Sequence, residues 1–105
     1  MKAALDYLQH ALEIRLKLFG EEHASTADSY LNLGVTHHSL GDFNAALDSK
    51  KHALEIRLKL FGEEHASTGN SYESLFFTQL CLGDLDGALE SAKHTRHAQI
   101  EVGEK

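Results

Sequence analysis

A segment that occurs twice limits the possible folds of this chain more than any other feature. HALEIRLKLFGEEHAST runs from His10 to Thr26 and again, without a change, from His52 to Thr68, 42 residues further on. A fixed period of about 20–50 residues is the signature of repeat architectures, in which one supersecondary unit stacks on the next. The repeat therefore predicts an array of similar units, and a function that depends on the surface of that array.

The charge, the hydropathy and the cysteine content limit the possible partners and the location of the protein. The net charge is −6 with histidine neutral, whereas binding to a nucleic-acid backbone needs clustered lysine and arginine. No apolar run approaches the ~18 residues of a membrane span, and the N-terminus lacks the apolar core of a secretion signal. The single cysteine, Cys81, cannot form an internal disulfide, which fits a reducing compartment. We therefore expect a cytoplasmic protein with no nucleic-acid or membrane partner.

The apolar residues recur at the spacing of an α-helix, and proline is absent. In the first segment they step by three or four positions along one helix face: Leu5, Leu8, Leu12, Leu16 and Phe19. A second apolar stripe lies beside the first, which indicates a helix that is covered on two sides. The second copy keeps this pattern, except that Lys50 stands where the first copy has Leu8.

A shorter helix is predicted between the long ones from its start and stop signals. Ser25 and Ser67 are expected to be N-caps, because a serine side chain can accept a hydrogen bond from a free backbone N–H group. Gly41 and Gly83 are expected to end these shorter helices, and Asp42 to cap the helix that follows. The expected helices cover residues 2–19, 25–39, 43–61, 67–81 and 85–101.

Short motifs at fixed distances indicate the type of repeat. They are YLNLG (30–34), GDF (41–43), AAL (45–47) and AL (53–54). This pattern resembles the tetratricopeptide repeat (TPR), a unit of two helices. The period is longer than usual for a TPR, with LEIR in the second helix and LFGEEH in the loop, and this longer form is similar to the kinesin light chain and nephrocystin type.

The resemblance implies an all-α TPR-like superhelix that occupies the whole chain as a single domain. The domain begins and ends with the second helix of a pair. It divides into a half unit (1–20), a first full unit (25–62) and a second, terminal unit (67–103).

Small residues are expected where the two helices of a pair cross, because they permit a close approach. In the first full unit these residues are Gly34, Ala46 and Ala53. The second unit departs from this pattern, since Phe76 stands in the place of Gly34. We therefore expect the packing of the second pair to differ.

The resemblance also implies a concave groove lined by the first helix of each pair. The matching positions in this chain are Asp28, Leu31, Asn32, Val35, His38, Ser39, Asn70, Glu73, Ser74, Phe77, Leu80 and Cys81. A TPR groove holds an extended peptide or a helix, so Asn32 is expected to bond a ligand backbone, and Leu31 and Phe77 to contact apolar side chains. Neither groove helix contains lysine or arginine, which argues against a clamp for a ligand's terminal carboxylate. The implied function is a non-catalytic scaffold or adaptor that binds a peptide or a partner domain.

Two other interpretations stay open. The first helix (2–19) has no partner helix, so either the chain belongs to a longer array or another molecule covers this end. Self-association or exchange of helices through residues 2–19 is the structural alternative. The eight histidines suggest metal-dependent assembly, although equivalent copies such as His10 and His52 lie too far apart to share one ion. Cys81 has no recognisable base partner, so we expect no enzyme, no catalytic residue, no metal and no cofactor.

Overall fold

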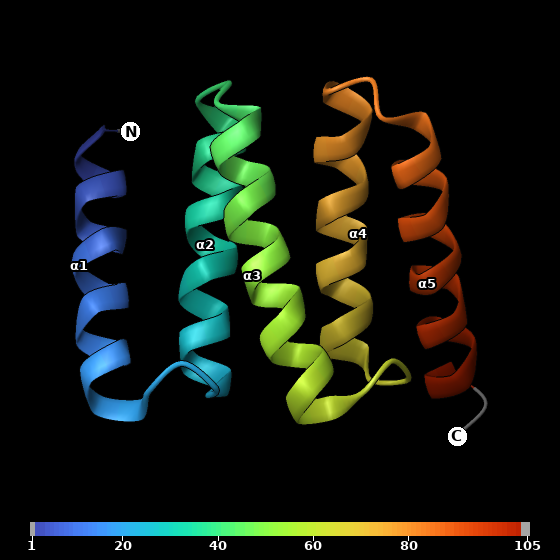
Figure 1. Cartoon of the computed structure of the whole chain (residues 1–105), viewed down its shortest axis with the longest axis horizontal. Helices are drawn as coiled ribbons and strands as arrows, with labels where there is room; N and C mark the ends of the chain where they lie inside the picture. Colours follow the sequence, from blue (N-terminus) through green and yellow to red (C-terminus); the bar gives the residue numbers. More distant parts are fainter. Residues whose placement is uncertain (1, 104–105) are drawn as a thin grey trace.

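The computed structural model describes residues 2–103, and the side chains of residues 3–98. The described chain forms α1 (Lys2–Phe19), α2 (Ala24–Ser39), α3 (Phe43–Phe61), α4 (Ala66–Cys81) and α5 (Leu85–Gly103). Successive helices are antiparallel and lie side by side, from α1 at one end of the molecule to α5 at the other (Figure 1). The expected all-α fold is confirmed, and the expected helix ends agree with the structure to within two residues. Within residues 2–103, none of the helices has both the length and the apolar character that crossing a membrane requires.

The caps of the short helices differ in part from the expectation. The N-caps are His23 and His65, not the serines two positions later: the Nδ1 atom of His23 accepts a hydrogen bond from the backbone N–H of Ser25 at 3.0 Å. Each cap histidine stacks on the phenylalanine that ends the preceding helix, with 4.4 Å between the ring centroids of Phe19 and His23. This stacking holds the imidazole where it can reach the free N–H groups of the helix.

The expected stop signals are confirmed. Gly41 and Gly83 have φ angles of 83° and 77°, a left-handed conformation that glycine adopts without steric cost. Asp42 caps α3, since its Oδ1 atom accepts a hydrogen bond from the backbone N–H of Ala45 at 3.3 Å. The chain therefore reverses direction between α2 and α3 within three residues.

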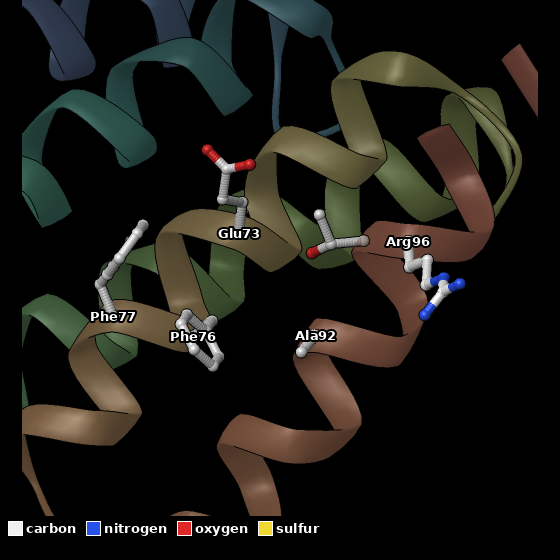
Figure 2. Close-up of a pocket in the computed structure, with 6 residues that line it drawn as sticks. Glu73, Phe76, Phe77, Ala92 and Arg96 are labelled. Atoms are coloured by element: carbon white, nitrogen blue, oxygen red, sulfur yellow. The ribbon is translucent and has the colours of Figure 1, made fainter. Parts of the chain in front are cut away.

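The two helix pairs use opposite solutions at their crossing. In the first pair Gly34 lies against Lys50, and a Cβ atom on Gly34 would stand 3.2 Å from the Ala46 carbonyl oxygen and 2.6 Å from Cγ of Lys50. In the second pair Phe76 replaces the glycine, and Ala92 stands where the first pair has the lysine. Figure 2 shows Phe76 of α4 turned toward Ala92 of α5. Each crossing thus combines one small residue with one large residue.

The arginine of the second LEIR motif joins one helix pair to the next. Arg57 is buried on α3, and its Nη1 atom donates hydrogen bonds to the Ser67 carbonyl at 3.0 Å and to the Ser71 hydroxyl at 2.9 Å, both on α4. Its Nη2 atom lies 2.8 Å from a carboxylate oxygen of Asp28 on α2. One side chain therefore holds three helices in a fixed arrangement.

The first LEIR motif repeats part of this arrangement. Arg15 of α1 donates hydrogen bonds of 3.0 Å to the Ser25 carbonyl and to the Ser29 hydroxyl of α2. Because two copies of one sequence make the same contacts, the position of each short helix follows from the long helix before it.

Replacing Arg57 with methionine tests this role. Arg57→Met keeps much of the apolar stem but leaves the carbonyl and the hydroxyl of α4 without a charged donor, so the free energy of unfolding should fall by about 2–3 kcal/mol. Arg15→Met is the matched control, because Arg15 is only half-buried and makes two of the three contacts. Urea unfolding followed by circular dichroism measures both variants. Equal losses in the two variants would contradict the proposed joining of three helices.

Candidate peptide-binding groove

The surface formed by the twelve residues predicted to line a concave face is here called the groove. The structure places nine of them at the surface as exposed residues: Asp28, Asn32, Val35, Ser39, Asn70, Glu73, Phe77, Leu80 and Cys81. Leu31, His38 and Ser74 are half-buried. The two helices that carry these residues are linked directly, since Nδ1 of His38 on α2 lies 3.0 Å from the Thr78 hydroxyl oxygen on α4.

Three apolar side chains of the groove remain largely in contact with water. Val35 is 47% exposed, Phe77 is 52% exposed and Leu80 is 43% exposed. Transfer of apolar surface out of water is favourable by about 25 cal/mol per Å², so these side chains would gain from contact with a ligand. The apolar part of the groove is therefore shared by both short helices.

Asp28, a predicted groove residue, has a structural task. Asp28 is exposed, but its carboxylate is held by the guanidinium of Arg57 at 2.8 Å. The equivalent residue of the next unit, Asn70, carries no charge. Asp28 therefore stabilises the link between α2 and α3, and the amides of Asn32 and Asn70 are the simpler candidates for contact with a ligand backbone.

A buried lysine lies beneath the groove, and its burial could not be seen from its place in the repeat. Lys50 of α3 is 3% exposed, and its Nζ atom donates hydrogen bonds to the Ser74 carbonyl at 2.9 Å and to the Thr78 hydroxyl at 2.7 Å. Both acceptors are uncharged, and burial lowers the pKa of Lys50. Although α2 and α4 contain no lysine or arginine, α3 therefore places one cation near the groove. Since this ammonium is buried, it cannot serve as a clamp for a ligand carboxylate.

A chain of hydrogen bonds runs from this lysine to the surface. Because the Thr78 hydroxyl accepts from Lys50, its own proton is free to be donated to Nδ1 of His38. This assignment leaves the proton of the imidazole on Nε2, which lies 4.0 Å from the Cys81 sulfur. Burial, and then the nearby Lys50, lower the pKa of His38. His38 is therefore a neutral part of the groove wall at physiological pH.

A small pocket opens between α4 and α5 at the edge of the groove (Figure 2). Its volume is about 280 Å³, and it is lined by Glu73, Phe76, Phe77, Ala92, Thr95 and Arg96. The adjacent rings of Phe76 and Phe77 meet edge to face, with 5.3 Å between their centroids. Sequence reasoning identified only Glu73 and Phe77 as site residues. The exchange of Gly34 and Lys50 for Phe76 and Ala92 was the signal that could have indicated this pocket.

Two histidines take part in the packing between the two helices of a pair. The ring of His52 stacks on Tyr30, with 4.0 Å between the centroids, and its Nε2 atom lies 3.1 Å from a carboxylate oxygen of Glu21. His94 stacks in the same way on Tyr72, at 4.6 Å. Among the described residues, no group of three or more histidine, cysteine or acidic side chains is arranged to hold a metal ion.

Comparison with known proteins agrees with this geometry. The family model of the tetratricopeptide repeat matches residues 1–59. The chain belongs to the tetratricopeptide repeat family. TPR proteins generally mediate protein–protein interactions, and no curated protein matches the sequence.

A solved structure extends the likeness over nearly the whole chain. The crystal structure of BtubC (BKLC) from P. vanneervenii is 25% identical in sequence, with a TM-score of 0.85. The match covers 91% of this TPR chain and 38% of that chain, so the present chain spans well under half the length of its structural relative.

Replacing Lys50 with methionine should stabilise the protein. Unlike Arg57, which pairs with a carboxylate, Lys50 buries its ammonium against two uncharged acceptors. Lys50→Met keeps the length of the side chain and removes this desolvated charge, so the free energy of unfolding at pH 7 should rise by about 1 kcal/mol. The pKa of Lys50 is lowered on folding from its ordinary value of 10.5, so the unfolded chain binds more protons between the two values and the wild type gains stability as the pH rises. The advantage of the variant should therefore shrink toward pH 10.5. Urea unfolding at several pH values measures this, and a destabilised variant at pH 7 would contradict the prediction.

Proposed function

We propose that this TPR chain is a non-catalytic scaffold that binds a peptide or a partner domain in the groove. The observation that carries the proposal is the exposure of Val35, Phe77 and Leu80, which lie on the two short helices that His38 and Thr78 join. Apolar side chains that gather on a surface rimmed by polar residues are typical of interaction sites. The membership of the TPR family supports the same class of function.

The groove favours a ligand with apolar side chains and an accessible backbone. The exposed amides of Asn32 and Asn70 can each donate to and accept from a peptide backbone. Glu73 adds a carboxylate to the lining of the pocket on the α4 side, and Arg96 adds a guanidinium on the α5 side. We therefore expect a ligand that places one apolar side chain in this pocket and a basic side chain near the carboxylate.

We further propose that the repeats are of the kinesin light chain and nephrocystin type. The period of 42 residues, the LEIR motif and the LFGEEH loop support this subtype. Cys81 is exposed and free, which fits a cytoplasmic location.

A second candidate function is self-association through α1. Tyr7, Ile14 and Leu18 of this helix are 74%, 55% and 69% exposed. Static light scattering over a concentration series separates this candidate from the first, because a mass that stays monomeric at every concentration rules out self-association.

Removal of two groove side chains tests the proposed function. The ligands are peptides selected from a display library for binding to the wild-type chain. The double variant Asn32→Ala and Phe77→Ala should bind these peptides more than about tenfold more weakly, because it lacks a hydrogen-bonding amide and an apolar anchor. Leu89→Ala is the matched control, since Leu89 is 56% exposed on α5 and lies outside the groove. Fluorescence anisotropy measures the affinities, and circular dichroism checks that helicity is unchanged. Equal binding by both variants would place the ligand elsewhere.

A further inference from the structure

Two helices that share a segment of identical sequence have different surroundings in this chain. Residues 10–19 of α1 and 52–61 of α3 are the same, yet Ile14 is 55% exposed while its equivalent, Ile56, is 4% exposed. The difference arises because α2 covers α3, whereas no described helix covers the corresponding side of α1 (Figure 1). α1 therefore presents to water a face that has the sequence of a buried helix interface. We call this surface the open face; it comprises Leu8, His10, Ala11, Ile14, Arg15 and Lys17.

The contacts between α2 and α3 show what this face is built to hold. Residues 20–41, which comprise α2 and its flanking turns, are here called the α2 segment. Three polar contacts connect this segment with α3: Glu21 with His52 at 3.1 Å, Glu22 with Lys59 at 3.1 Å, and Asp28 with Arg57 at 2.8 Å. The equivalents of these three basic residues on α1 are His10, Lys17 and Arg15. The open face thus repeats a set of positive and hydrogen-bond-donating groups that, on α3, is matched by three carboxylates.

The stacking and packing contacts between α2 and α3 also have counterparts on α1. On α3, the ring of Tyr30 stacks on His52, and Gly34 lies against Lys50. On the open face His10 takes the place of the histidine, and Leu8 takes the place of the lysine. A hollow of about 410 Å³ lies beside this histidine, lined by Asp6, Tyr7, His10, Ala11 and Ile14.

We propose that the open face docks a helix from outside these 105 residues, and that this helix has the chemistry of the α2 segment. The docked segment carries two adjacent carboxylates before the helix, an aspartate near its start, then an aromatic ring two residues later and a glycine four residues after the ring. The carboxylates pair with His10, Lys17 and Arg15, and the ring stacks on His10. This site lies at the end of the array and is separate from the groove.

The second unit of this chain lacks two of these features, which makes the proposal selective. In α4 the position of Asp28 is occupied by Asn70, and the position of Gly34 by Phe76. A phenylalanine opposite Leu8 would overfill the crossing, since the protein places Phe76 against an alanine. The α2 segment of a second copy is already engaged with its own α3. A second copy of the chain is therefore a poor occupant of the open face.

Labelled synthetic peptides added to the whole chain test the proposal. A peptide of residues 20–41 carries all the required features, and a peptide of residues 62–83 lacks two of them. Fluorescence anisotropy should show saturable binding of the first peptide and at least about tenfold weaker binding of the second. Either the loss of a charged contact or a steric clash is sufficient for a factor of this size. Substitution of Asn70→Asp and Phe76→Gly in the second peptide should restore the affinity.

Variants of the chain locate the binding. Ile14→Glu should abolish binding of the 20–41 peptide without unfolding the protein, because Ile14 is exposed. Lys17→Glu should weaken binding, and a peptide with Glu22→Lys should recover it. Phe77→Ala, in the groove, should leave binding unchanged, so that failure of the groove proposal and failure of this one are distinguished.

Three results of the peptide experiments would overturn the proposal. They are the absence of binding of the 20–41 peptide at up to about 1 mM, equal binding of the two unmodified peptides, and binding that survives Ile14→Glu. Self-association of the chain that Ile14→Glu removes would also overturn it, because the occupant would then be a second copy.

Discussion

The arginine of each LEIR motif is the contact on which the arrangement of the helices depends. Arg57 donates to two oxygens of α4 and pairs with Asp28 of α2, so that three helices share one buried charge. A buried guanidinium is stable only when its donors are occupied, and here the start of the next short helix supplies the acceptors. Because α2 and α4 are both positioned in this way, the groove is a surface set by the packing behind it. Its apolar side chains stay exposed while the polar groups beneath them are satisfied.

The groove has solvent-exposed side chains at its surface and, beneath them, polar groups that are already hydrogen-bonded to one another. Lys50 donates to Ser74 and Thr78, and Thr78 in turn reaches His38 on the opposite helix. This chain of bonds fixes the spacing of the two helices and occupies the groups that could otherwise compete for a ligand. A ligand of the proposed site would therefore meet exposed apolar side chains and the amides of Asn32 and Asn70. Its affinity would come from burial and backbone hydrogen bonds, as in other peptide-recognition surfaces, and its specificity from the pocket next to Phe76.

The helices and their ends could be predicted from the sequence, because helical periodicity and glycine stops are local signals. The N-caps could not: serine is the better cap by propensity, but stacking on Phe19 places His23 in the capping position. The burial of Lys50 was not predicted, because a lysine in a stripe of leucines resembles a surface substitution. The pocket was missed because it depends on two changes, at Phe76 and Ala92, that lie on different helices. Each omission concerns a contact between helices, and a single helix pattern carries little information about such contacts.

The two copies of LEIRLKLF show that sequence alone does not decide whether a helix face is core or surface. In α3 the isoleucine of this motif is buried under α2, and in α1 the same isoleucine faces water. Since the side chains are the same, the free energy that α3 gains from its partner is in principle available to α1 when a suitable helix arrives. Three acidic residues contact α3, two in the loop before α2 and one on α2. They indicate which helix is suitable, because His10, Arg15 and Lys17 repeat the groups that those acids contact. We infer that the interface that builds the fold also serves as a recognition surface on α1, whose corresponding side no described helix covers.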